Sequence, residues 1–173
     1  AVPHTDVPAL LTRLLDRFGL VAVVSGRPVE FLVPLLPPGL VLAGLYGLEL
    51  VVDGVRRDHP QASNWREVVD DVAGRAELRG PAGVGVERKG LSITMHYRTV
   101  PDQEAATAAY AAEEALRSGL EARPARMSWE LHPPIEVDKG TAVLDLVDDL
   151  RAVAFAGDDV GDLPGFDALD ELA

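Results

Sequence analysis

AVAFAGDDVGDLPGF, residues 152–166, is the stretch of this chain that points most directly to a fold. Its apolar first part, residues 152–156, runs into a glycine, a pattern typical of a short buried strand in a parallel sheet. Ligands of open α/β sheets bind just beyond the carboxyl ends of such strands, and here that position holds Asp158, Asp159 and Asp162. Adjacent carboxylates repel one another, and hard oxygen ligands suit Mg²⁺. The segment therefore predicts an α/β fold with a magnesium site, although an acidic loop in solvent would look similar.

The composition narrows the classes of protein to which the chain can belong. Its 173 residues are 47% hydrophobic and 25% charged, as in packed soluble domains. A formal net charge of -12 argues against nucleic acid or an anionic membrane surface as a partner. The absence of cysteine excludes disulfides, thiol catalysis and thiolate metal sites. No leader pattern or apolar run of membrane-spanning length is evident, so we expect a cytoplasmic protein.

The predicted elements change their order along the chain. Residues 7–57 alternate between helix and strand, as in a parallel sheet with helices on its faces, and Asp53-Gly54 between apolar flanks predicts a hairpin. Residues 63–132 instead read as helix, hairpin, helix, hairpin, which is typical of a small α+β lobe with an open-faced antiparallel sheet. Asp138 then caps a helix that we expect to extend to Leu150.

This order predicts a discontinuous architecture. We expect a Rossmann-like α/β core with a parallel sheet, made of residues 1–57 and 134–173. An α+β cap, residues 58–133, would be inserted into it.

Two places in the predicted core carry candidates for chemistry. Ser25-Gly26-Arg27-Pro28 lies where a strand meets a helix, and a hydroxyl, free backbone N–H groups and a helix N-terminus form an anion site. Ser25, Gly26 and Arg27 are therefore candidates for substrate binding, with an ordinary turn as the alternative. Lys139 falls in the first turn of a helix, where the dipole disfavours a cation by up to about 1 kcal/mol. Its placement is easier to understand if it faces a carboxylate or a phosphoryl oxygen, with a solvated lysine as the alternative.

The predicted cap carries a polar strand face. In VERKGLSITMHYR, residues 86–98, Glu87 and Lys89 share a face on one strand, and Ser92, Thr94, His96 and Arg98 share one on the next. A face with charges and hydroxyls suits a polyhydroxylated ligand, although a solvated face would look similar.

WELHPP, residues 129–134, adds three residues to this lobe. Glu130 is a candidate for the polar face, and Trp129, on the opposite face, is expected in the core. His132 has no second histidine or cysteine at metal-ligand spacing, so we expect it to be structural.

Together these segments resemble haloacid-dehalogenase-type phosphatases, and among them the trehalose-6-phosphate phosphatases. The resemblance rests on VAVVSGRPVEFL (21–32), LAGLYGLEL (42–50), VERKGLSITMHYR (86–98), WELHPPIEVDKG (129–140) and FAGDDVGDLPGF (155–166), in this order. It implies a Rossmann-like core, an inserted α+β cap, Mg²⁺ as cofactor, and hydrolysis of trehalose 6-phosphate through an aspartyl-phosphate intermediate. It also implies trehalose-6-phosphate synthase as a candidate partner.

The resemblance also assigns roles to residues. Ser25 and Lys139 would hold the transferring phosphoryl group, Asp158 would bind Mg²⁺, and Asp159 and Asp162 would support the metal site. The cap positions that contact the sugar match Glu87, Lys89 and Glu130.

Two departures from the family pattern matter. Tyr46 stands where the family's GxHG motif has histidine, which affects a cap-closing or structural contact. More importantly, the 173 residues contain no D-x-D-x-T motif, which in the family supplies the nucleophilic and acid/base aspartates. We therefore expect the sequence as given to be a fragment of a longer enzyme and to be inactive alone. The alternatives are a non-catalytic sugar-phosphate-binding or regulatory domain, and a phosphatase for a related sugar phosphate.

Overall fold

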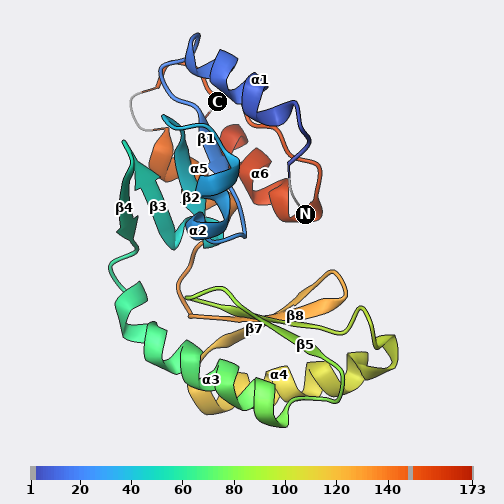
Figure 1. Cartoon of the computed structure of the whole chain (residues 1–173). Coiled ribbons are helices and arrows are strands. Elements are labelled where there is room, and N and C mark those ends of the chain that lie inside the picture. Colours follow the sequence, from blue (N-terminus) through green and yellow to red (C-terminus); the bar gives the residue numbers. More distant parts are fainter. Residues whose placement is uncertain (1–2, 148–149, 173) are drawn as a thin grey trace. The chain divides into compact units, whose positions relative to one another are not determined.

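The computed structural model describes residues 3–147 and 150–172, and the chain divides into two compact units (Figure 1). The first unit runs up to His59 and resumes at Glu136, and the second is Pro60–Ile135. The assignment of the first unit as a phosphatase core and of the second unit as a substrate cap remains a prediction. No helix among the described residues is long and apolar enough to cross a membrane.

The first unit contains one four-stranded sheet, in the order β1-β2-β3-β4, with helices on its faces. Its strands are β1 (Ala22–Val24), β2 (Val41–Gly44), β3 (Glu49–Val52) and β4 (Val55–Asp58). Its helices are α1 (Val7–Leu15), α2 (Val29–Leu32), α5 (Lys139–Leu146) and α6 (Leu163–Glu171), with the short 3₁₀ turns η1 (Val33–Leu35), η2 (Leu45–Gly47) and η5 (Val160–Asp162).

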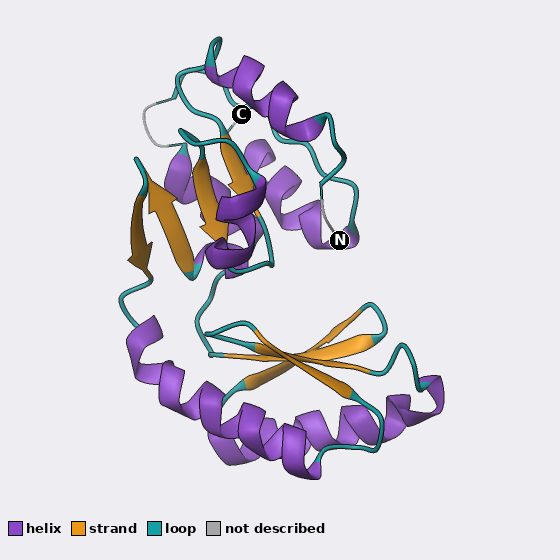
Figure 2. Ribbon diagram, viewed as in Figure 1, coloured by secondary structure: helices purple, strands orange, loops and turns teal. Residues whose placement is uncertain are grey.

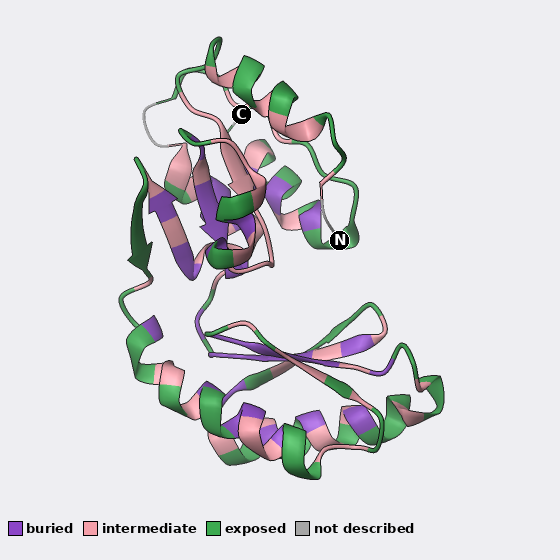
Figure 3. Cartoon of the chain, in the orientation of Figure 1, coloured by how far each residue is buried: buried purple, intermediate pink, exposed green. Residues whose placement is uncertain are grey.

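The pairing in this sheet is partly parallel. β1 and β2 pair in parallel, whereas β2–β3 and β3–β4 are antiparallel. The hairpin predicted at Asp53-Gly54 is confirmed, since both residues have the positive φ (51° and 73°) that a two-residue primed turn requires. β4 is exposed along its whole length and forms an edge of the sheet (Figure 3).

The prediction of a buried strand at residues 152–156 was wrong. The segment is not in a strand, and Val153 and Phe155 alternate as half-buried residues with exposed neighbours. A strand exists only where a second strand completes its hydrogen-bond ladder, and no described strand pairs with this segment. The Phe155 ring instead packs edge-on against Phe166 of α6, with centroids 4.9 Å apart. The helix expected to reach Leu150 also ends earlier, at Leu146.

The second unit is a sheet with both of its helices on one face (Figure 2). Its antiparallel strands, in the order β5-β6-β8-β7, are β5 (Gly85–Arg88), β6 (Ile93–His96), β8 (Ser128–His132) and β7 (Glu121–Ala125). Its helices are α3 (Arg66–Arg79) and α4 (Glu104–Ser118), preceded by the 3₁₀ turns η3 (Ala62–Trp65) and η4 (Pro101–Gln103). The elements expected here from the sequence are confirmed.

Strand alternation divides this sheet into an apolar and a polar face. Ile93, Met95 and Leu131 point to the helices and pack on Val69 and Val72 of α3, fully out of solvent. The alternate positions point the other way. We call this second surface the polar face; it comprises Glu87, Lys89, Ser92, Thr94, His96, Glu121, Arg123, Ser128, Glu130 and His132.

α3 and α4 are also joined by a buried carboxylate. Glu114 of α4 is 1% exposed, and its two oxygens accept from Arg75 of α3 at 2.9 Å and from Arg117 at 2.8 Å. A buried charge is stable only when it is paired. Glu114 therefore ties the two helices together behind the sheet.

We predict that Glu114→Gln destabilises the second unit by about 3 kcal/mol, because two arginines then lose their buried counter-charge. Urea unfolding followed by tryptophan fluorescence isolates this unit, since both tryptophans of the chain, Trp65 and Trp129, lie in it. Glu113→Gln is the matched control, because Glu113 pairs with the same Arg117 but is exposed, and it should cost less than about 1 kcal/mol. Equal losses for the two variants would contradict the prediction.

Candidate active site

The start of α5 is fixed by its own sequence. Asp138 accepts from the backbone N–H of Thr141 at 2.8 Å, and the Thr141 hydroxyl accepts from the Asp138 N–H at 2.9 Å. This reciprocal capping box makes Lys139 the first residue of the helix. The next residue must be glycine, because a Cβ at Gly140 would lie 2.5 Å from the carbonyl oxygen of Pro164. The first turn of α5 therefore packs directly on the first turn of α6.

This packing brings Lys139 to Asp162. The ammonium group donates to Asp162 Oδ1, while Asp162 Oδ2 accepts from the backbone N–H groups of Asp158 and Asp159, each at 2.9 Å. Burial alone would raise the pKa of Asp162, but the bonds from Lys139 and from these two N–H groups outweigh it and hold the pKa below its usual range. Asp162 is 5% exposed and ionised. It is thus the anion that Lys139 faces here.

The three acids of this loop have different surroundings. Asp162 has both carboxylate oxygens engaged, and its N–H donates to the backbone carbonyl of Asp159 at 2.9 Å. Asp158 and Asp159 are exposed. Within the described part of the chain, no group of three or more histidine or acidic side chains lies close enough to hold a metal ion. Mg²⁺ is often held by only one or two protein carboxylates, with waters and substrate phosphate as its other ligands, and the exposed carboxylates of Asp158 and Asp159 are donors of that kind.

The loop after β1 is held by its own polar groups. Ser25 Oγ accepts from the Arg27 N–H at 3.0 Å, and the Ser25 N–H donates to the Ala43 carbonyl at 2.8 Å. We expected free N–H groups at this junction, but those of Arg27 and Val29 are occupied. The Arg27 N–H donates to Ser25 Oγ, and the Val29 N–H donates to a Glu49 carboxylate oxygen at 2.8 Å. The Ser25 hydroxyl accepts from the Arg27 N–H and keeps its own proton, which it can donate to an anion.

Glu49 is a residue that the sequence analysis missed. It is 2% exposed on β3, and its second oxygen accepts from Arg56 of β4 at 2.7 Å. Its carboxylate joins the start of α2 to two strands and thereby positions the Ser25 loop. A signal was present in the sequence, since in Glu49–Val52 an acid occupies the inward face that Val51 shares.

Tyr46 also holds this loop in place. Leu45 and Tyr46 both have positive φ, 48° and 63°, which is costly for residues with a side chain. Hydrogen bonds from Leu45 N–H to Arg27 O (3.1 Å) and from Tyr46 N–H to Ser25 O (3.0 Å) maintain this conformation. The Tyr46 hydroxyl lies 2.6 Å from where a Cβ on Gly26 would be, so only glycine fits there. In this chain Tyr46 thus makes a structural contact with the loop.

The cap candidates meet on the polar face of the second unit. Lys89 Nζ and the Ser92 hydroxyl both donate to Glu130 Oε1, at 3.1 and 3.0 Å. Glu87 lies 2.8 Å from His96 Nε2. Lys89 and Glu130 are largely buried, with side chains 10% and 9% exposed. The structure therefore gathers all three cap residues expected to contact a sugar on one face.

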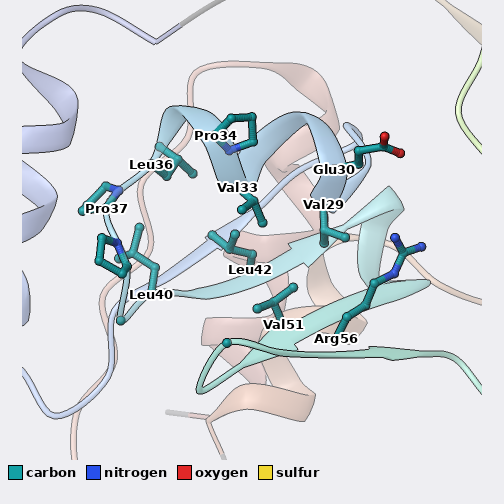
Figure 4. Close-up of a pocket in the computed structure, with 13 residues that line it drawn as sticks. Val29, Glu30, Val33, Pro34, Leu36, Pro37, Leu40, Leu42, Val51 and Arg56 are labelled. Carbon is teal, nitrogen blue, oxygen red and sulfur yellow. The ribbon is translucent and has the colours of Figure 1, made fainter.

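One hollow of the first unit contains none of the candidate residues (Figure 4). Its volume is about 520 Å³, and it lies between α2 and the β2–β3 strands, with Val33, Leu42 and Val51 in its wall. Glu30 and Arg56 are its only charged lining residues. Specific sites combine an apolar wall with several convergent polar groups, so this hollow is a weaker candidate than the Lys139 region.

Comparisons with known proteins agree with this geometry. The trehalose-phosphatase family model matches residues 1–173. A trehalose-phosphate phosphatase of Mycobacterium avium is 33% identical over 181 residues, covering 98% of this chain and 46% of that protein. The chain thus spans about half the length of the curated relatives that it matches.

Solved structures share the fold. The crystal structure of a trehalose-6-phosphate phosphatase related protein matches with a TM-score of 0.86 at 23% identity, over 98% of this chain and 74% of that one. The C-terminal domain of the C. albicans trehalose-6-phosphate phosphatase matches with a TM-score of 0.74 at 23% identity, over 99% of this chain and 67% of that one. These matches confirm the predicted mixed α/β fold. The family model covers residues 1–173, so the chain belongs to the trehalose-phosphatase family.

Proposed function

We propose that the protein containing this chain hydrolyses trehalose 6-phosphate to trehalose and phosphate, with Mg²⁺ as cofactor. The observation that carries the proposal is the Lys139–Asp162 pair, which holds the Asp158-Asp159 backbone beside a cation. A fixed cation next to exposed carboxylates suits a phosphate dianion bound together with a metal ion. Family membership supplies the substrate class.

In this proposal the first unit binds the phosphoryl group. Lys139 places its positive charge against the phosphoryl oxygens, and Asp162 orients the ammonium without being consumed. The Ser25 hydroxyl and Arg27 donate to the same group, with Gly26 allowing the close approach of the loop. The Ser25 loop is preorganised, because Glu49 and Tyr46 fix its backbone before substrate arrives.

The Asp158 carboxylate would hold Mg²⁺, with Asp159 and Asp162 supporting the loop that carries it. When bound, the ion neutralises charge on the phosphoryl oxygens. The 173 residues contain no D-x-D-x-T motif, so the side chains described here bind and orient the phosphate ester and do not attack it.

The second unit would select the sugar. Glu87, Lys89 and Glu130 present two carboxylates and an ammonium on one face, and sugars bind where such donors and acceptors converge. We propose this unit, near residues 58–133, as the substrate cap and the first unit as the phosphatase core. Family membership also makes a trehalose-6-phosphate synthase a candidate partner.

A second candidate function follows from the missing motif. A chain that clamps phosphate and sugar without a nucleophile would act as a sugar-phosphate-binding or regulatory domain. The two functions differ in whether phosphate is released.

We predict phosphate release from trehalose 6-phosphate with Mg²⁺ by a version extended upstream to include a D-x-D-x-T segment, and none by residues 1–173 alone. In the active form, Lys139→Met should lower kcat by about 10²–10³, the usual cost of losing one group that stabilises transition-state charge. Arg151→Met, at an exposed basic position, is the control and should leave kcat unchanged. Binding of trehalose 6-phosphate by both forms without release would favour the binding-domain function.

We predict that Asp162→Asn costs about 3 kcal/mol of stability at pH 6, because Lys139 loses a buried counter-charge. The pKa of Asp162 is lowered by folding, so its contribution is complete above the unfolded-state pKa of about 3.9 and is lost as pH falls through the lower folded-state value. The stability gap between wild type and variant should therefore shrink from pH 6 to pH 3. Urea unfolding followed by far-UV circular dichroism measures it.

Asp170→Asn is the matched control, since Asp170 is exposed on α6, the helix that follows Asp162. The difference in stability between Asp170→Asn and wild type should stay near zero from pH 6 to pH 3. A gap for Asp162→Asn that does not change with pH would show that the carboxylate contributes no charge-dependent stabilisation.

A further inference from the structure

Two buried polar atoms on the polar face have no hydrogen-bond partner. Across the described residues, the buried side-chain atoms without a partner are Thr94 Oγ1, Tyr110 Oη and His132 Nε2. Tyr110 lies on α4, behind the sheet. Thr94 and His132 both lie on the polar face, and they are 3% and 6% exposed. Buried polar groups are almost always paired, so two unpaired atoms on one surface call for an explanation.

Thr94 lies at the centre of a row of polar residues. The strand register pairs Thr94 with Glu87 on β5 and with Glu130 on β8. Directly opposed residues on one face have Cβ atoms about 5 Å apart. Thr94 is therefore flanked by the two carboxylates proposed as sugar contacts. Each of these has a partner on the protein, Glu87 with His96 and Glu130 with Lys89 and Ser92, whereas the Thr94 hydroxyl has none among the described residues.

His132 offers an acceptor of fixed orientation. Its Nδ1 lies 2.8 Å from the Pro133 carbonyl oxygen, which can only accept, so Nδ1 carries the proton. Burial, together with the charge of Arg123, lowers the pKa of His132 and keeps the ring neutral. Nε2 is then a bare acceptor, and the nearest carboxylate, Glu121 at 3.7 Å, cannot donate to it. His132 follows Glu130 by two residues, so both point to the same face.

We propose that Thr94 and His132 are sugar-binding residues of the polar face, the Thr94 hydroxyl bonding one ligand hydroxyl and His132 Nε2 accepting from another. The inference rests on the proposed function and adds to it two residues that determine specificity. It also revises the structural role expected for His132. Thr94 is flanked by the carboxylates of Glu87 and Glu130, which are held by His96 and by Lys89 and Ser92. A polyhydroxylated ligand would reach Thr94 by replacing those bonds with its own hydroxyls.

The hydroxyl of Thr94 can be removed without changing the shape of the side chain. Thr94→Val is nearly isosteric, and Thr94→Ser keeps the hydroxyl. We expect Thr94→Val to bind trehalose 6-phosphate about tenfold more weakly, as for loss of one hydrogen bond, and to bind inorganic phosphate with unchanged affinity. Thr94→Ser should bind within about twofold of wild type. Isothermal titration of the full chain with Mg²⁺ present measures each affinity, and His132→Phe should behave like Thr94→Val.

The melting temperature separates binding from structure. If the Thr94 hydroxyl has no partner in the free protein, Thr94→Val should melt at the wild-type temperature or above, since an unpaired buried hydroxyl is replaced by a methyl group. A lower melting temperature with unchanged sugar affinity would overturn the inference, because the hydroxyl would then have a structural partner.

Failure of the inference and failure of the proposed function give different results. If wild type and Thr94→Val bind trehalose 6-phosphate equally well, the inference is wrong and the proposed function still stands. If wild type binds no trehalose 6-phosphate, the proposed function fails. The sugar-binding inference is then tested by titration with free trehalose, followed by the NMR signals of Thr94 and the His132 ring. Shifts confined to these residues would support the sugar site, and unshifted signals would overturn it.

Discussion

The carboxylate of Asp162 is the constraint on which the acidic loop of the first unit depends. The segment that leads into this loop has no ladder partner among the described strands. Side-chain bonds therefore take the place of a sheet in fixing where Asp158 and Asp159 lie. One oxygen of Asp162 holds both of their backbone N–H groups, and the other holds Lys139. The backbone that carries the exposed carboxylates and the cation are thus positioned by the same group.

Local signals in the sequence predicted most of the fold. The hairpin at Asp53-Gly54 and the cap at Asp138 depend on backbone geometry within a few residues, and the structure contains both. The strand expected at residues 152–156 depends instead on a neighbour distant in the chain. Apolar periodicity shows that a segment is able to pair, and only the rest of the sheet decides whether it does.

The same distinction applies to the candidate site. A cation in the first turn of a helix is anomalous by itself, which is why Lys139 could be identified from sequence. The acid on the inward face of β3 was a signal for Glu49 that went unused, and its role becomes clear only from Val29 and Arg56, which bond its two oxygens. His132 could not be recognised either, because its character comes from burial and from the carbonyl that fixes its tautomer. Roles that depend on burial or on hydrogen-bond geometry are not visible in the pattern of a single sequence.

The two units treat their polar atoms in opposite ways, and this contrast bears on specificity. Around Lys139 the carboxylate oxygens of Asp162 are satisfied by the protein itself, and the proposed function assigns the cation they hold to binding a phosphate group. On the polar face, by contrast, two buried atoms of the described residues, Thr94 Oγ1 and His132 Nε2, have no hydrogen-bond partner. A site with unpaired buried groups rejects ligands that lack the matching hydroxyls far more strongly than an apolar pocket rejects a poor fit, because the groups stay unpaired when the wrong ligand binds. Under the proposed function, discrimination among sugar phosphates would therefore arise in the second unit, while the first unit would recognise the phosphate that they share.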